Sequence, residues 1–407
     1  MTGAGSPLVS RLRPFTTTIF AQMSALAESS GAINLGQGFP DTDGPPAMLE
    51  AARAAIAAGV NQYPPGPGTL ELRTAVADRR RVDRGQHFDP DTEVLITVGA
   101  TEAIAAAMLA LVQAGDEVVL LEPYYDSYPA AVAMAGARHR SVPLRRDETG
   151  TFVVDIDALA AAITPATRLL LLNSPHNPTG TVFSRSELAA IAELAVAHDL
   201  LVVTDEVYEY LTFDGAEHLP IGTLPGMAER TLTVSSAGKT FSATGWKIGW
   251  ACGPAALVAA VRAAKQFLTY VGGAPFQPAV AHALNHEMAW VTQLRQDLQG
   301  KRDRLCAGLR AAGFDVGTPG GTYFAVADIT SIAARLGMPA DGMALCLQLP
   351  DRAGVVAVPQ QVFYDDPATG ARFVRFAFCK RDGVIDEAVR RLSALPLSAL
   401  PPSARPS

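Results

Sequence analysis

The sequence predicts an α/β protein with a mainly parallel, doubly wound sheet, and three observations support this fold class. From about residue 94, short and nearly continuous apolar runs alternate with Ala-rich helical stretches. The apolar runs are bounded by Gly, Pro, Asn or Asp, as expected for strands that are buried on both faces. Each helical stretch can serve as the crossover that joins two parallel strands.

The expected elements follow in order along the chain. Strands are expected at 94–98, 117–121, 168–172, 200–204 and 231–235, and helices at 101–114, 130–135 and 187–198. After about residue 280 the pattern changes to a long charged helix at 290–310, followed by shorter strands at 322–327 and 373–378. This change predicts a second, smaller α+β domain.

The domain organisation follows from this change in pattern. We expect a large domain at 44–280 and a small domain that is built from both ends of the chain, 1–43 and 281–395. The Pro- and Ser-rich segment 396–407 is expected to be a flexible tail.

Composition excludes several classes of protein. The 407 residues are 49% hydrophobic, which is enough for a sizeable core and excludes disordered, collagen-like and disulfide-scaffold proteins. The formal net charge of −7 and the mixed charges give no basic surface for nucleic acid. We find no apolar run typical of a signal peptide or a membrane span, and the four cysteines are far apart. We therefore expect a cytoplasmic protein without membrane or nucleic-acid partners.

Small and polar residues collect where the expected strands end. These segments are 99–101, 173–178, 205–208 and 236–239. In a doubly wound sheet ligands bind at the carboxyl ends of the strands, so the four segments predict one pocket. Lys239 lies there among small residues, and a partly desolvated lysine can lose its proton and act as a nucleophile. On this observation alone, a solvated loop lysine remains the alternative.

Five motifs occur in an order that identifies a family. They are Asn-Leu-Gly-Gln-Gly-Phe-Pro-Asp at 34–41, Ser-Pro-His-Asn-Pro-Thr-Gly at 174–180, Asp-Glu-Val-Tyr at 205–208, Ser-Ser-Ala-Gly-Lys-Thr-Phe at 235–241 and Val-Arg-Phe at 374–376. Together they resemble the class I and II aminotransferases over roughly residues 8–395. The resemblance implies the fold type I of pyridoxal 5'-phosphate transferases, with a mainly parallel seven-stranded sheet in the large domain.

The resemblance also implies how the ring of the cofactor is held. Lys239 is expected to attach covalently to the cofactor aldehyde and to move the substrate α-proton. Asp205 is expected to pair with the pyridine nitrogen, Asn177 and Tyr208 to hydrogen-bond the phenolic oxygen, and Tyr125 to stack on the ring. Asn173 and Tyr124 are the neighbouring alternatives for the Asn and the stacking Tyr.

The phosphate is expected to bind where residues 99–101 open a helix, because free backbone N–H groups at a helix N-terminus attract anions. By resemblance Ala100, Thr101 and Ser236 contribute donors there and Lys247 a positive charge. Many relatives have arginine in place of this lysine, which is a point charge rather than a planar fork. Tyr63 matches a tyrosine that reaches the phosphate from a neighbouring subunit, which implies a homodimer with shared active sites.

The substrate α-carboxylate is expected to bind Arg375, which can form a bidentate pair, with Gly36 and Asn177 beside it. Arg372 is the rival, but three residues away in a strand it would face the opposite side. His282 and His286 have helical spacing but lack a third ligand, so we expect no metal site. Residues 36–38 do not continue into a dinucleotide fingerprint, so a dehydrogenase is disfavoured.

The expected activity is ping-pong transamination with glutamate and 2-oxoglutarate as one substrate pair. Segments 61–68 and 272–278 look most like the N-succinyldiaminopimelate aminotransferases of lysine biosynthesis, which implies N-succinyl-LL-2,6-diaminopimelate as the other amino donor. A broad kynurenine, methionine or glutamine aminotransferase, with possible β-lyase activity on cysteine conjugates, is the alternative. A non-catalytic regulator and another reaction of the same cofactor are more distant alternatives.

Overall fold

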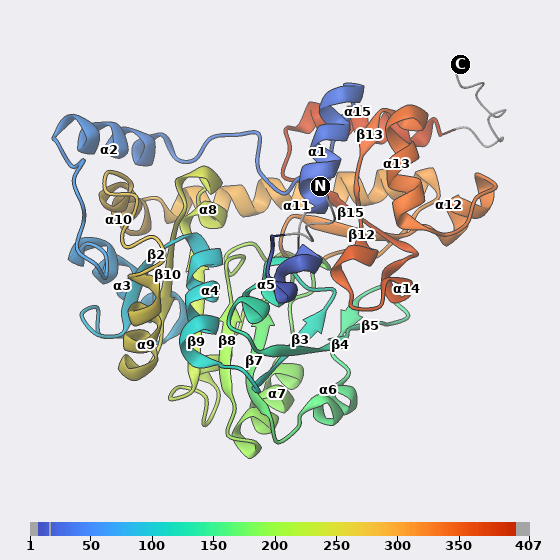
Figure 1. Ribbon diagram of the computed structural model, residues 1–407. Helices are drawn as coiled ribbons and strands as arrows, with labels where there is room; N and C mark the ends of the chain where they lie inside the picture. Colours follow the sequence, from blue (N-terminus) through green and yellow to red (C-terminus); the bar gives the residue numbers. More distant parts are fainter. Residues whose placement is uncertain (1–6, 16–17, 396–407) are drawn as a thin grey trace, which may run out of the picture.

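The computed structural model describes residues 7–15 and 18–395, and a seven-stranded sheet forms the centre of its larger part (Figure 1). The strand order is β2 (Val94–Val98), β10 (Ile248–Cys252), β9 (Thr231–Ser236), β8 (Leu201–Asp205), β7 (Thr167–Asn173), β3 (Glu117–Glu122) and β4 (Arg138–Pro143). Within this sheet only β10 is antiparallel to its neighbours. The prediction of a mainly parallel seven-stranded sheet is confirmed.

Both faces of the central sheet are covered by helices, and β7 shows why. Leu169 and Leu171 pack with α4 (Gly99–Leu111), α5 (Ser127–Met134) and α9 (Ala255–Lys265). Leu170 and Leu172, which point to the other face, pack with α6 (Ile156–Ala162) and α7 (Arg185–Ala197). Since successive side chains alternate between faces, a strand buried on both sides must be apolar throughout.

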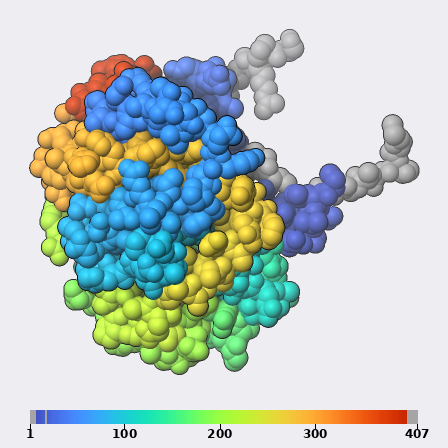
Figure 2. Space-filling model, turned by 90° about the vertical axis from the view of Figure 1, so that its left-hand side faces the viewer, coloured from blue at the N-terminus to red at the C-terminus, as the bar shows by residue number. Residues whose placement is uncertain are grey.

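A third group of helices covers the end of the sheet that carries β2 and β10. These helices are α2 (Pro46–Ala57), α3 (Leu70–Arg84) and α10 (Phe276–His286), and their apolar side chains form one cluster with β2 and β10. In the space-filling view of Figure 2 the blue segment with α2 and α3 lies beside the yellow segment with α10 on one face.

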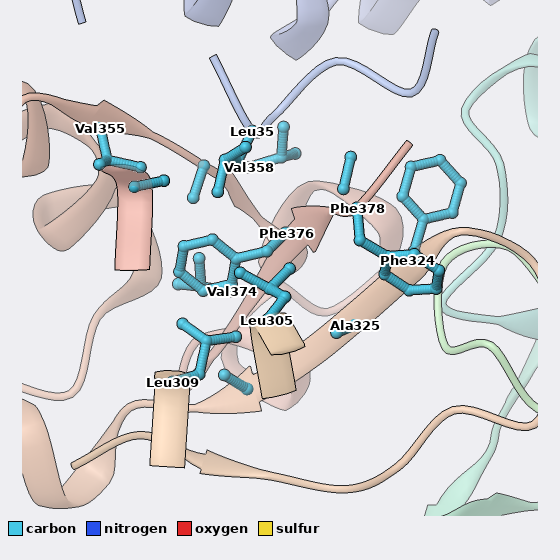
Figure 3. Close-up of a cluster of buried hydrophobic side chains, with 14 of the residues drawn as sticks. Leu35, Leu305, Leu309, Phe324, Ala325, Val355, Val358, Val374, Phe376 and Phe378 are labelled. Atoms are coloured by element: carbon cyan, nitrogen blue, oxygen red, sulfur yellow. The ribbon is translucent and has the colours of Figure 1, made fainter. Parts of the chain in front are cut away.

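The smaller part of the structure is a four-stranded antiparallel sheet with helices against it. Its strand order is β11 (Asp315–Val316), β12 (Phe324–Asp328), β15 (Phe373–Ala377) and β14 (Val358–Pro359). Figure 3 shows Leu305 and Leu309 of α11 (Met288–Ala312) packed near Val374 and Phe376 of β15. The predicted long charged helix is α11, and one of its faces is buried in this core.

The two ends of the chain meet in this smaller part. β1 (Ile33–Asn34) pairs in parallel with β13 (Val355–Val356), and α1 (Ile19–Ser30) packs in the same core as α13 (Gly342–Ala353) and α15 (Asp382–Ser393). The domain boundaries themselves stay a prediction, and the expected tail at 396–407 lies outside the described residues. None of the helices at 7–15 and 18–395 is long and apolar enough to cross a bilayer.

Short elements complete the described chain: the 3-10 helices η1 (Ser10–Phe15), η2 (Ile221–Thr223), η3 (Thr244–Trp246) and η4 (Gln360–Phe363), the strands β5 (Arg145–Arg146) and β6 (Phe152–Val153), and the helices α8 (Ala237–Thr240), α12 (Thr330–Arg335) and α14 (Pro367–Gly370).

Most predicted elements agree with the structure to within a few residues, and one shift has a clear cause. The strand expected from 322 begins at Phe324, because Thr322 has a left-handed backbone with φ of 65°. A β-branched residue rarely adopts this conformation, so it is not anticipated from the sequence pattern. Strands β4 and β10 of the central sheet are not among the expected elements.

Candidate active site

A cavity that opens to solvent lies at the carboxyl ends of the parallel strands, and its empty volume, open solvent included, is about 980 Å³. Residues from all four predicted segments line it, which confirms that the strand ends converge. The predicted site residues in its lining are Ala100, Thr101, Tyr125, Asn177, Asp205, Tyr208, Ser236, Lys239, Lys247 and Arg375. Gly36 and Tyr63 lie outside the lining.

One end of the cavity is shaped to receive an anion. Helix α4 begins at Gly99, whose φ is 74°, and its N-cap residue Val98 makes no side-chain cap hydrogen bond. A Cβ at Gly99 would lie 3.2 Å from Nζ of Lys247, so this ammonium group sits directly against the start of the helix. A Cβ at Gly249 would lie 2.9 Å from the backbone nitrogen of Ala100. Strand β10 can therefore lie this close to the start of α4 only because residue 249 is a glycine. The unshared N–H groups and the Lys247 charge fit a phosphate.

Asp205 lies at the end of β8, deep in the cavity, and both of its oxygens have partners. The Tyr128 hydroxyl donates to Oδ2 at 2.7 Å, and the Val207 backbone N–H donates to Oδ1 at 3.2 Å. Burial raises the pKa of Asp205 to about 6, although both hydrogen bonds and the Lys239 charge oppose the shift. Because a carboxylate oxygen has two lone pairs, Oδ1 can still accept from a cationic ring N–H, which would lower this pKa again.

Lys239 lies in α8, where it lines the cavity and also contacts the smaller part of the structure. Its Nζ donates a hydrogen bond of 2.8 Å to the hydroxyl of Tyr323. Burial lowers the pKa of Lys239 to about 8; Cys379 and Asp205 oppose this shift, and the charges of Lys247 and Arg375 add to it. A substantial fraction of this amine is therefore neutral near pH 8 and available as a nucleophile or base.

Arg375, on β15, is 1% exposed and reaches into the cavity from the smaller sheet. Nη1 donates to Oδ1 of Asn177 at 3.1 Å, and Nη2 donates to the carbonyl oxygen of Gly36 at 3.0 Å. The guanidinium carbon lies 4.0 Å from the ring centre of Phe324, and Nε has no partner among the described residues. Burial lowers the pKa of Arg375 to about 10, which leaves the group cationic at neutral pH.

The structure also chooses between the neighbouring alternatives. The Arg372 side chain is 53% exposed and pairs with Asp328 at 3.1 Å, so it is turned away from the cavity. The Tyr124 hydroxyl donates to Asp365 at 2.8 Å, whereas Tyr125 lines the cavity. These positions favour Arg375 and Tyr125.

Asn173 and Asn177 both line the cavity, but their contacts differ. Asn173 Nδ2 donates to the backbone oxygen of Asp205 at 2.8 Å, and its Oδ1 accepts from the backbone N–H of Asn177 at 2.7 Å. Asn173 therefore links the ends of β7 and β8 through backbone contacts, while the Asn177 side chain hydrogen-bonds Arg375.

A buried charge cluster lies directly after Asp205. Glu206, Glu209 and His218 bring potential metal ligands together, but Arg80 lies 2.8 Å from Glu206 and 2.7 Å from Glu209. Burial alone would raise the pKa of Glu206, but the charge of Arg80 and the contact with His218 outweigh burial and hold this pKa below its ordinary value. The cluster is therefore an ion-pair network that fixes the loop after β8.

Two residues that contact the predicted ones were missed from the sequence. Tyr128 bonds Asp205 from α5, and Tyr323 bonds Lys239 from the start of the smaller sheet. Tyr128 lies in the first turn of α5, three residues after Tyr125, and this closeness in sequence gives only a weak signal. Tyr323 has no signal of this kind, because the fold alone brings it to Lys239.

The fold and this lysine-centred site define an aminotransferase, and comparison with known proteins agrees. The chain belongs to the family "Aminotransferase class I and II", whose model matches residues 30–392, and it is a pyridoxal-phosphate-dependent enzyme of this family. The resemblance identified from the motifs is confirmed.

The similarity extends over nearly the whole chain. The solved structure of N-succinyldiaminopimelate aminotransferase from Mycobacterium tuberculosis is 61% identical, with a TM-score of 0.93, and the match covers 96% of this chain and 100% of that one. Methionine aminotransferase of Escherichia coli is 38% identical over 96% of this chain and 99% of its own length. Kynurenine–oxoglutarate transaminase of Dictyostelium discoideum is 38% identical over 92% and 93% of the two chains.

Proposed function

We propose that this enzyme transfers an amino group between N-succinyl-LL-2,6-diaminopimelate and 2-oxoglutarate in diaminopimelate and lysine biosynthesis. The observation that carries the proposal is the 61% identity to the mycobacterial N-succinyldiaminopimelate aminotransferase over 95% of this chain. The methionine and kynurenine enzymes reach 38% over similar lengths, so they support the alternative less strongly.

The residue roles in this proposal are those that the family resemblance implies, and the places of these residues around the cavity support them. The start of α4 at Ala100 and Thr101, with Ser236 and Lys247, would hold the phosphate of pyridoxal 5'-phosphate. Asp205 would bind the pyridine nitrogen. The contact residues for the rest of the ring would be Tyr125 on its face and Asn177 and Tyr208 at the phenolic oxygen.

The cofactor, when bound, supplies an electron sink for the bond that breaks at the substrate α-carbon. Lys239 would hold the cofactor covalently, release it when the substrate amine arrives, and then carry the α-proton with its neutral Nζ. Asp205 would keep the pyridine nitrogen protonated by remaining an anion beside it. One site would serve both halves of the reaction in turn, which is why ping-pong kinetics are expected.

Arg375 would bind the α-carboxylate of each substrate. Its contacts with Asn177 and Gly36 use two of the five guanidinium N–H groups, so three remain for a carboxylate. The carbonyl of Gly36 would thus orient the guanidinium, and Asn177 would orient both the guanidinium and the cofactor. Substrate specificity beyond the α-carboxylate would depend on other parts of the pocket.

We further propose a homodimer in which Tyr63 reaches the phosphate of the partner's site. Tyr63 is 81% exposed and lies outside the cavity of its own chain, as this role requires. It packs edge-on against Tyr270 at 5.5 Å, and Phe267 nearby in sequence is 85% exposed. Large aromatic side chains exposed together are typical of a subunit interface.

We also propose a cytoplasmic location, because the four cysteines are buried and unpaired, as is usual in a reducing compartment.

Substrate identity is tested by comparing kcat/KM for N-succinyldiaminopimelate, kynurenine and methionine, each with 2-oxoglutarate. The proposal predicts a preference of at least about a hundredfold for the succinylated substrate, which corresponds to roughly 2.7 kcal/mol. Equal or better use of kynurenine or methionine would favour the broad-specificity alternative. A β-lyase assay with a cysteine conjugate then measures the side activity of that alternative.

Shared sites are tested by mixing Tyr63→Ala with Lys239→Ala, two variants that are each expected to be impaired. If the sites are shared, hybrid dimers contain one site with both native residues, and activity rises on mixing under conditions of subunit exchange. A monomer in sedimentation velocity would contradict the proposal.

A further inference from the structure

Tyr323 is the direct hydrogen-bond partner of the Lys239 amine, and it lies outside the lining of the cavity. The residue is 1% exposed and stands behind Lys239, on the side of the smaller sheet. Its hydroxyl oxygen lies 2.8 Å from Nζ of Lys239 and 2.6 Å from the carbonyl oxygen of Gly38. One phenol therefore joins the reactive amine to the loop that follows β1.

The direction of both hydrogen bonds is fixed by their chemistry. A carbonyl oxygen only accepts, so the single hydroxyl proton of Tyr323 goes to Gly38. The phenol oxygen must then accept an N–H from Lys239. When the neutral amine of Lys239 donates one N–H to Tyr323, its lone pair points away from the line that joins Nζ to the Tyr323 oxygen. The lone pair is then free to face the cavity that Lys239 also lines.

The surroundings hold Tyr323 in this position. Thr322, immediately before it, has φ of 65° and is fully buried; strain of this kind persists only where the surrounding structure imposes it. A Cβ at Gly38 would run into Cζ of Phe324 and lie 3.2 Å from Cε2 of Tyr323, so only glycine allows the carbonyl to come this close. The ring of Tyr323 also packs edge-on against Tyr208 at 5.2 Å.

We propose that Tyr323 is a positioning residue for the transamination step, which holds the free amine of Lys239 by accepting an N–H bond and directs its lone pair toward the reacting carbon. Tyr323 itself gains and loses no proton. Burial raises the pKa of its phenol well above the ordinary value, which agrees with a hydroxyl that stays neutral. The inference rests on the proposed role of Lys239.

The test uses Tyr323→Phe, which keeps the ring and its packing but removes the oxygen. The matched control is Tyr210→Phe, because the Tyr210 hydroxyl also donates one hydrogen bond, of 2.7 Å, but to Asp83 and outside the cavity. For both variants, the rate at which full-length, cofactor-free enzyme attaches pyridoxal phosphate is followed by visible absorbance. The equilibrium affinity for pyridoxamine phosphate, which has no aldehyde, reports separately on the rest of the cofactor pocket.

We expect Tyr323→Phe to attach the cofactor about tenfold more slowly, as loss of one orienting hydrogen bond to an amine predicts. Its affinity for pyridoxamine phosphate and its substrate KM should stay within about twofold of wild type, and the α-deuterium isotope effect on kcat should rise. Tyr210→Phe should match wild type in attachment rate and isotope effect.

An unchanged attachment rate and isotope effect in Tyr323→Phe would overturn the inference, and so would an equal slowing in the control. If Tyr323→Phe does not fold, the same measurements are made on Tyr323→Met, whose flexible side chain fills part of the space of the ring without a hydroxyl. Wild-type enzyme that fails to attach the cofactor would instead contradict the proposed role of Lys239.

Discussion

Replacing Arg375 with lysine should weaken productive binding of both the amino donor and the oxo-acid by about tenfold to a hundredfold. The guanidinium is 1% exposed and bonds Asn177 and Gly36, so it presents its remaining N–H groups in one fixed orientation. An ammonium cannot reproduce this fork and loses at least one charge-assisted hydrogen bond, worth roughly 1.5–3 kcal/mol. Since about 1.4 kcal/mol is a factor of ten, kcat/KM should fall by that range.

The assay is steady-state kinetics in both directions, with KM expected to carry most of the change. Arg372→Lys is the matched control, because that side chain is 53% exposed, pairs with Asp328 and should leave kcat/KM within about twofold. Covalent cofactor attachment should be unchanged in both variants. A twofold or smaller effect in Arg375→Lys, or an equal loss in the control, would refute the assignment of the α-carboxylate to Arg375.

Three further predictions address the cofactor site and its support. Tyr128→Phe removes the 2.7 Å hydrogen bond to Asp205, which opposes the rise that burial causes in the pKa of this carboxyl group. The acidic limb of the kcat profile should therefore move to higher pH, and an unchanged limb would contradict this role of Tyr128. The rate of cofactor attachment to the cofactor-free enzyme should rise about tenfold per pH unit and level off above pH 8, since the pKa of Lys239 is about 8 and only the neutral amine reacts; a rate independent of pH would contradict this. Arg80→Met should lower the free energy of unfolding by about 3–5 kcal/mol in denaturant titration, because it leaves the buried Glu206 without its cation.

Much of the fold could be predicted because its strands are buried on both faces. An apolar run such as that of β7 is nearly continuous, so it is not mistaken for an amphipathic helix or a half-exposed strand. Polar residues mark where such a run ends. Strand β10 was missed because it contains Gly249 and follows a turn, so its pattern is that of a loop. Glycine is required there by the close approach to α4, a tertiary reason that no local pattern encodes.

The cavity residues could be predicted because they occur in ordered motifs at strand ends. The sequence leaves Asn173 and Arg372 as rivals of Asn177 and Arg375. The structure shows that Asn173 bonds the backbone of Asp205 and that Arg372 lies at the surface. Tyr128 and Tyr323 could not be found in this way, because they act on site residues from other elements. The role of Tyr63 stays a prediction, since it depends on a second copy of the chain.

The role of Lys239 is tested most directly by reducing the holoenzyme with borohydride and mapping the modified residue by mass spectrometry. The chain has five lysines, Lys239, Lys247, Lys265, Lys301 and Lys380, so each is readily distinguished in a digest. Because Lys239 lines the same cavity as Asp205 and Arg375, we expect one phosphopyridoxyl group, attached to Lys239 alone. Attachment to any of the other four lysines, or no attachment at all, would contradict it.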